Sequence, residues 1–255
     1  MQIENIILKI RDFLEKQKFN NTNFTLYNIS NDPLSFFNKL ELNVQLENHK
    51  EIILQEETLL ELGGVNRESF LLIFPTKEES LVNNGRITLI GPEIKDIKGN
   101  SVDFGLFILL GCKKITEEDF DNLRQFSFIS NSIEGFMIRT IPRRFWCRIN
   151  SNILPKFSFE FLGNAIQYLY KQQFKDLVQD VEIIMLCSKP DLIDNFKELT
   201  SELYNYINSK WSKKIEIWKK RIDCEYDWNC EDCPYIETCD KIRDVLEERK
   251  KMEDD

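Results

Sequence analysis

Apolar residues near the start of the chain recur at helical spacing. The positions are Ile3, Ile6, Ile7, Ile10, Phe13 and Leu14, with charged residues between them. This period predicts an amphipathic helix. Helical periodicity also covers residues 158–174 and 190–220. A further helix is expected after Thr116, because Asp119 stands three positions on, as in a capping box.

Runs with the character of strands fill the intervals between these helices. Residues 24–55 hold short apolar or alternating segments separated by Asn, Asp and Pro, which predict a β-rich region. Four apolar runs across 59–112, broken by Gly-Gly, Pro and Gly-Pro, predict central strands. Residues 134–150 read as two strands joined by a turn near Pro142, and VEIIMLC as another strand. Together the pattern predicts an α+β (α/β layered) fold, a mixed sheet flanked by helices.

Composition narrows the class of protein. A hydrophobic share of 42% and an aromatic share of 12% are sufficient for a sizeable core. The net charge of −9 disfavours nucleic acid as a partner. A single histidine, His49, argues against triad chemistry. Because no apolar run is long enough to cross a bilayer and no signal peptide is apparent, we expect a cytoplasmic protein without a membrane partner.

The seven cysteines fall into two groups. Three are isolated within apolar runs and are expected in the core: Cys112, Cys147 and Cys187. Four lie together in DCEYDWNCEDCPYIETCD and are expected to bind metal: Cys224, Cys230, Cys233 and Cys239. Four thiolates this close can hold a [4Fe-4S] cluster or a zinc ion, and spacing alone leaves both open. The alternative to metal binding is that the four cysteines are surface thiols on a loop. We therefore predict a main domain over 1–220 and a four-cysteine module with a terminal helix over 221–255.

The segment GFMIRTIPRRFWCRI gathers arginines around one tryptophan. Strand alternation places Arg144, Trp146 and Arg148 on one face, and Phe145, Cys147 and Ile149 on the other. Arg139 and Arg143 lie on or near the turn. Guanidinium groups bind phosphate and an indole stacks on a purine, so the set suits a nucleotide-like ligand such as CoA. The alternative is a solvated edge whose arginines pair with acidic residues.

A family resemblance rests on segments in a fixed order. They are LLELGG, GRITLIGPEI, SVDFGLFILLGC, IEGFMIRTIPRRFWCRI, FSFEFLGNAIQYLYKQQF and VEIIMLC. This order resembles the acetyl-CoA synthase family, the beta subunit of the CO dehydrogenase/acetyl-CoA synthase (acetyl-CoA decarbonylase/synthase) complex, over roughly residues 55–190. The resemblance implies an arginine-rich α+β middle domain, a link between Trp146 and CoA, and cubane-ligand roles for the four clustered cysteines. The family's Cys-Gly-Cys motif for the distal nickel has no counterpart in this sequence.

The resemblance implies an iron-sulfur protein with an electron-transfer or accessory role in anaerobic one-carbon or CoA metabolism. Its expected partner is a CO dehydrogenase/acetyl-CoA synthase-type or redox protein. Two other functions stay open. One is a truncated CO-methylating acetyl-CoA synthase subunit that needs a partner, and the other is a structural or interaction module built around zinc.

Overall fold

A computed structural model describes residues 3–20, 23–46, 53–64, 66–124, 129, 132–138 and 145–209. The chain divides into two compact units: one is Gln2–Ser201, and the other is Met1 together with Glu202–Asp255. In the second unit, residues up to 209 are described and helical. The predicted domain boundary at 220 and the four-cysteine module lie outside the described residues. The labelled helices and strands all lie in the first of these units, Gln2–Ser201.

Helices and strands alternate along this unit. The helices are α1 (Ile3–Phe19), α2 (Pro33–Lys39), α3 (Glu117–Asn122), α5 (Phe159–Gln173) and α6 (Pro190–Leu199), with short 3-10 turns η1 (Glu79–Leu81) and η2 (Ile94–Asp96). The strands are β1 (Phe24–Asn28), β2 (Thr58–Gly63), β3 (Ser69–Thr76), β4 (Arg86–Ile90), β5 (Ser101–Val102), β6 (Phe104–Cys112), β7 (Phe136–Ile138), β8 (Trp146–Asn150) and β9 (Val178–Cys187). The fold is α+β, as the sequence predicts.

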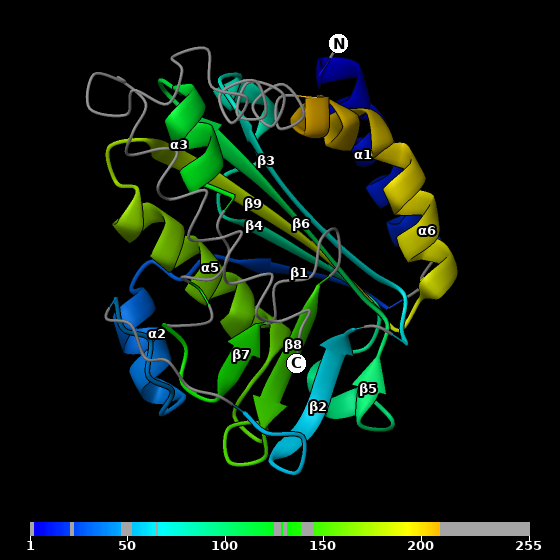
Figure 1. Ribbon diagram of the computed structural model, residues 1–255, viewed down its shortest axis with the longest axis vertical. Helices are drawn as coiled ribbons and strands as arrows, with labels where there is room; N and C mark the ends of the chain where they lie inside the picture. The colour runs from blue at the N-terminus through cyan, green and yellow to red at the C-terminus, as the bar shows by residue number, and fades with distance from the viewer. Residues whose placement is uncertain are drawn as a thin grey trace, which may run out of the picture. The chain divides into compact units, whose positions relative to one another are not determined.

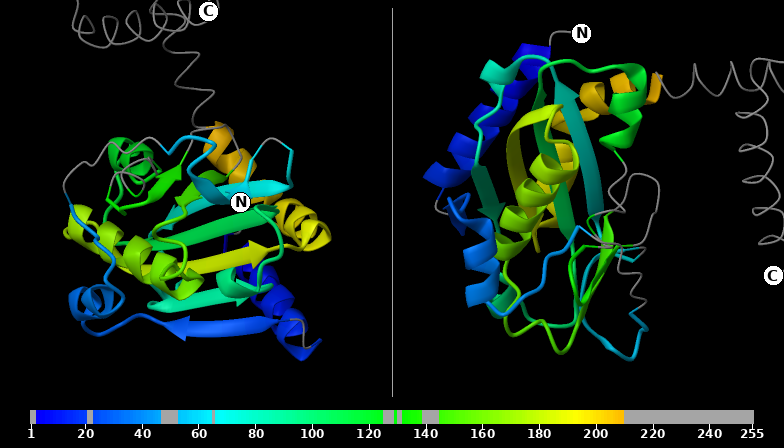
Figure 2. Two further views of the ribbon diagram at one scale, coloured as in Figure 1. Left: turned by 90° about the horizontal axis from the view of Figure 1, so that it is seen from below. Right: turned by 90° about the vertical axis from the view of Figure 1, so that its left-hand side faces the viewer.

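A five-stranded mixed sheet in the order β1-β4-β9-β6-β3 forms the centre of the unit (Figure 2). Helices α1 and α6 lie on one side of it, and α2, α3 and α5 on the other (Figure 1). Strand β6 is buried at every position, which explains its uninterrupted apolar sequence. Phe196 of α6 packs edge-on against Phe13 of α1 and Phe107 of β6, with ring centroids 5.4 and 5.7 Å away.

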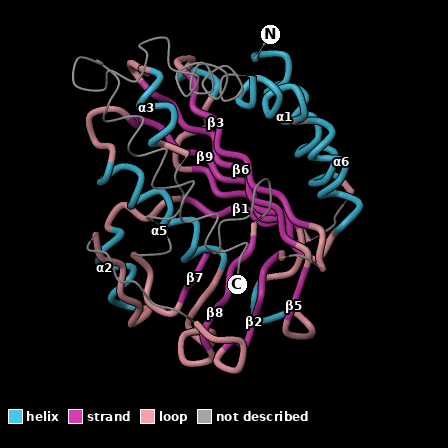
Figure 3. The backbone as a smooth tube through the Cα atoms, in the orientation of Figure 1, coloured by secondary structure: helices cyan, strands magenta, loops and turns pink. Residues whose placement is uncertain are grey.

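A second sheet of four strands, in the order β5-β2-β8-β7, adjoins the first (Figure 3). Strands β7 and β8 pair antiparallel, which confirms the two predicted strands; the predicted turn near Pro142 lies outside the described residues. Phe104 of β6 joins the layers, because its ring lies 5.0 Å from that of Phe145 and 5.3 Å from that of Phe159, centroid to centroid. The main core therefore lies between the two sheets and α5.

The region 24–55 differs from its predicted β-rich character. Strand β1 forms, but Pro33–Lys39 folds as helix α2. The local signal for this helix was present: Asp32 is the N-cap, its carboxylate accepts a hydrogen bond from the Ser35 N–H at 3.0 Å, and Pro33 stands in the first turn. The predicted helix over 190–220 is interrupted at Thr200, where α6 ends, and its residues 210–220 lie outside the described residues. Among the described residues, no helix is long and apolar enough to cross a membrane.

Candidate functional site

A cavity of about 570 Å³ lies on the face of the four-stranded sheet that carries Trp146. We call it the Trp146 pocket. Its lining residues are Gln55, Thr58, Glu61, Gly63, Gly64, Asn66, Arg67, Asn100, Ser101, Trp146 and Arg148. The strand register explains the set, because Glu61 of β2 is paired with Ser101 of β5 on one side and with Arg148 of β8 on the other. Residues paired across neighbouring strands share a face of the sheet.

Alternation along β8 follows the sequence prediction. Phe145, Cys147 and Ile149 have no measurable exposure and face the core. Trp146 is half-buried, and both it and Arg148 line the pocket on the opposite face. The strand therefore brings two of the five predicted ligand-binding residues to one cavity.

Arg148 is held by protein partners at the base of this pocket. Its Nε donates to Glu61 Oε1 at 2.8 Å, and its Nη1 donates to the Ile53 carbonyl at 3.2 Å. The guanidinium carbon lies 5.4 Å from the centre of the Trp146 ring, within the range of a cation–π contact. Only 8% of the residue is exposed. Arg148 thus pairs with an acidic residue, as the alternative expected, but it is buried and not on a solvated edge, and its guanidinium lies beside the indole.

The turn after β2 is shaped to receive the indole of Trp146. Gly64 has φ +113, and a Cβ added there would lie 3.3 Å from Trp146 Cδ1. Gly63 has φ +71, and its Cβ would lie 2.0 Å from the Phe145 carbonyl oxygen. That carbonyl accepts a hydrogen bond from the Gly64 N–H at 3.1 Å. Both positions require glycine, since an L side chain is strained at these angles and the space is filled.

Arg67 supplies an exposed guanidinium to the pocket, and the sequence reasoning missed it. Its Nε donates to Ser101 Oγ at 3.3 Å, and the residue is exposed to solvent. The turn sequence GGVNRES contained the signal, because a residue just beyond a strand-ending Gly-Gly turn lies at the rim of the sheet face. Arg67 is thus the described arginine best placed to meet an anion from solvent.

The remaining predicted site residues cannot be placed in this geometry. Arg139, Arg143 and Arg144 lie outside the described residues, and so do Cys224, Cys230, Cys233 and Cys239. Their assignments to anion and metal binding stay predictions. Within the described part of the chain, no group of three or more His, Cys, Asp or Glu residues is arranged to hold a metal ion.

The three isolated cysteines are buried free thiols, as predicted. Burial raises the pKa of Cys112 and that of Cys187 to about 12. It holds the pKa of Cys147 well above the ordinary value. These thiols are protonated at neutral pH, which makes them poor nucleophiles and poor metal ligands.

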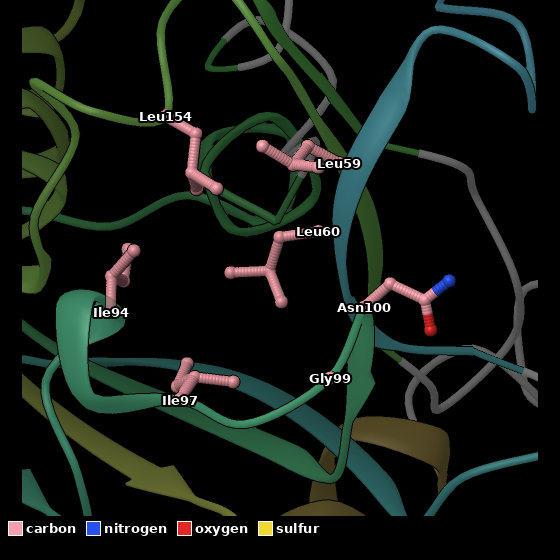
Figure 4. Close-up of a pocket in the computed structure, with 7 residues that line it drawn as sticks. All are labelled: Leu59, Leu60, Ile94, Ile97, Gly99, Asn100 and Leu154. Carbon is pink, nitrogen blue, oxygen red and sulfur yellow. The ribbon is translucent and has the colours of Figure 1, made fainter.

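A second cavity of about 380 Å³ lies under the start of β2, and we call it the Leu60 pocket. It is lined by Leu59, Leu60, Ile94, Ile97, Gly99, Asn100 and Leu154. Figure 4 shows the five aliphatic side chains around the space and the Asn100 amide directed away from it. Asn100 also lines the Trp146 pocket, so one residue forms part of both walls.

A half-buried carboxylate fixes the turn that forms one wall of the Leu60 pocket. Glu93 precedes η2, and its Oε1 accepts hydrogen bonds from the N–H groups of Ile94 and Phe159, each at 2.8 Å. The Tyr27 hydroxyl donates to its Oε2 at 2.5 Å. Burial, followed by this bond to Glu93, raises the pKa of Tyr27 above its ordinary range. The network ties η2 to β1 and to the start of α5, and so sets the position of Ile94 and Ile97.

Comparison with known proteins identifies the family. The model of the CO dehydrogenase/acetyl-CoA synthase complex beta subunit family matches residues 40–192, more than half of the chain. This chain belongs to that family. The matched range includes both cavities and the whole of the four-stranded sheet.

Relatives within the family are distant and much longer. The acetyl-CoA decarbonylase/synthase complex subunit beta of Methanopyrus kandleri is 26% identical over 65% of this chain and 36% of its own length. The carbon monoxide dehydrogenase/acetyl-CoA synthase subunit alpha of Moorella thermoacetica is 25% identical over 60% of this chain and 21% of its own. The acetyl-CoA decarbonylase/synthase complex subunit beta 2 of Methanosarcina thermophila is 27% identical over 48% of this chain and 26% of its own length. The match spans about a third or less of each relative.

Proposed function

We propose that this chain binds CoA, or a closely similar phosphorylated nucleotide, in the Trp146 pocket. The observation that carries the proposal is the meeting of an indole, a solvent-facing guanidinium on Arg67 and a set of amide and hydroxyl groups in one cavity. An indole face stacks on a base, and a guanidinium binds phosphate through charge-assisted hydrogen bonds. The names of the relatives, which refer to acetyl-CoA, support the same ligand class.

Two roles are separated within the pocket. Arg67 faces the ligand, whereas Arg148 is engaged by Glu61 and Ile53 and orients the indole. Loss of Arg67 therefore removes the contact with phosphate and one exposed hydrogen bond to Ser101. Loss of Arg148 also leaves the Glu61 carboxylate without its cation.

Calorimetric titration with CoA tests this proposal on the full chain. We expect Arg67→Met to weaken CoA binding about tenfold, the equivalent of one charge-assisted hydrogen bond. We expect Trp146→Ala to weaken it by a similar or larger factor through loss of stacking. Arg86→Met, which removes a guanidinium from β4 outside the pocket, is the matched control and should bind as wild type. Wild type that gives no heat with CoA at millimolar concentration would remove the proposal.

We further propose that Cys224, Cys230, Cys233 and Cys239 hold a [4Fe-4S] cluster and that the protein has an electron-transfer or accessory role. The support is the grouping of four cysteines in the sequence and the membership of relatives in a complex named for CO dehydrogenase and acetyl-CoA synthase. The proposed partner is a component of such a complex or a redox protein. A cytoplasmic location is proposed because thiols stay reduced there.

Metal analysis with absorption and EPR spectra, on protein purified without oxygen, tests the cluster. About four irons per chain, a broad band near 400 nm and a signal after dithionite, all lost in Cys230→Ala, are expected. Cys112→Ala is the matched control, because that thiol is buried in β6 and should not affect iron content. Colourless protein with zinc would replace the redox role with a structural one. Stoichiometric nickel would instead favour a truncated acetyl-CoA synthase.

A further inference from the structure

The Trp146 and Leu60 pockets flank the same open end of the β2–β5 pair. At this end, the outermost backbone hydrogen bond between β2 and the β5 segment runs from the Glu61 N–H to the Asn100 carbonyl at 2.8 Å. Register pairing with β5 begins at Glu61 and includes no earlier residue of β2. Leu59, Leu60 and Gly99 therefore lie beyond the end of the ladder, where the backbones are not joined by the sheet.

A β-bulge gives this end of β2 its apolar surface. Thr58 pairs with Asn150 and Leu60 with Ile149, so Leu59 is an extra residue opposite the β8 strand. A bulge re-aims the side chain at its position and bends the strand. Both Leu59 and the next residue, Leu60, consequently line the same cavity, although neighbours in a regular strand face opposite ways. Leu59 remains 46% exposed, so its side chain lines the cavity and is also accessible from solvent.

The two cavities differ in chemistry in a way that fits a ligand with two parts. The Trp146 pocket offers an indole, a guanidinium, amides and hydroxyls, whereas aliphatic side chains dominate the Leu60 pocket. Asn100 stands between them, with its backbone at the Leu60 pocket and its amide directed away from those side chains (Figure 4). CoA has the same division, a phosphorylated nucleoside followed by an arm with a dimethyl-substituted carbon and amide groups.

We propose that the Leu60 pocket is a second subsite, which binds the pantetheine arm of CoA after it passes Asn100 from the Trp146 pocket. The aliphatic side chains pack against the dimethyl carbon and the methylene groups of the arm. The Asn100 amide is placed to hydrogen-bond an amide of the arm as it crosses the end of the β2–β5 pair. This inference rests on the proposed CoA site, and it adds the subsite that would distinguish CoA from other nucleotides.

Titration of two ligands into the full chain tests the subsite. Adenosine 3′,5′-bisphosphate carries the nucleotide part of CoA without the arm. We expect wild type to bind CoA about tenfold more tightly than the bisphosphate, because burial of even a few methylene groups of the arm is worth that factor. We expect Leu59→Asn to weaken CoA binding about fivefold and to leave the affinity for the bisphosphate unchanged.

Leu54→Asn is the matched control, since Leu54 is 49% exposed in the adjacent turn but lines neither cavity. It should change neither affinity. Leu154→Asn is a second variant, at another residue that lines the Leu60 pocket, and should repeat the selective loss. Equal affinities of wild type for the two ligands, or a Leu59→Asn variant that binds both as wild type does, would overturn the subsite while leaving the nucleotide site intact. Failure of both ligands to bind would overturn the proposed CoA site itself.

Discussion

The strongest test of the fold concerns an ion pair between α1 and the centre of the sheet. Glu182 of β9 has no exposed surface, and both of its carboxylate oxygens accept hydrogen bonds from the Arg11 guanidinium. The Asn83 N–H adds a bond to Glu182 Oε2 at 2.9 Å. Arg11 also donates to the Leu81 carbonyl at 2.8 Å. A carboxylate this deeply buried depends on the cation that reaches it.

Replacing Arg11 with Met keeps an unbranched apolar stem and removes the charge. Glu182 is then left without a cation, and such a loss costs about 3–5 kcal/mol of unfolding free energy. For a unit of this size the change corresponds to a fall in melting temperature on the order of 10 °C. Urea unfolding followed by circular dichroism measures it, and the midpoint should fall with little change in slope.

The matched control is Lys156→Met, because the Lys156–Glu41 pair lies at the surface, with side chains 42% and 75% exposed. Its loss should cost less than about 1 kcal/mol. In the double variant Arg11→Met/Glu182→Met, apolar groups replace both charges, and most of the loss should be recovered. The reasoning is wrong if Arg11→Met matches the surface control, or if the double variant is no more stable than the single one.

Three further outcomes follow from the local geometry. Asp32→Ala should lower the unfolding free energy by about 1 kcal/mol through loss of the α2 cap, as measured by urea unfolding. Gly63→Ala should cost more, about 2–4 kcal/mol, and should shift the emission of Trp146, because the new methyl displaces the Phe145 carbonyl. Cys112 should resist iodoacetamide at pH 8 in folded protein and react in urea, as mass spectrometry can follow. Since burial raises its pKa to about 12, the stability that its protonated thiol contributes is fully present below about pH 9 and is lost as the pH rises toward 12.

Much of the fold could be predicted because its strongest signals are local. The period of α1 and the apolar run of β6 each determine the element without reference to the rest of the chain. The alternation Phe145-Trp146-Cys147-Arg148 likewise predicted which side chains face the core. Helix α2 was missed because its seven residues are too short for a clear period, although Asp32 and Pro33 marked its start.

The candidate site was less predictable because its lining depends on strand order. Arg67 and Ser101 are far apart in sequence, and they meet only because β5 lies beside β2 at the edge of the second sheet. The partner of Arg148 was equally hidden, since Glu61 faces it through the β2–β8 register. A pattern of apolar and polar residues identifies the face of a strand, but it does not identify the neighbouring strand.

The residues that line the two cavities and the residues that bond to the carboxylates behind them come from different parts of the chain. Every residue of the two cavities lies within the range matched by the family, 40–192. Arg11, which neutralises the buried Glu182 of that range, comes from outside it, and so does Tyr27, which bonds to Glu93. Segments beyond the match thus supply hydrogen-bond partners to two carboxylates of the matched region, the buried Glu182 and the half-buried Glu93. In a fragment limited to 40–192, those carboxylates would lose these partners, so the fragment should be less stable than the full chain. Ligand binding is therefore best measured on the full chain.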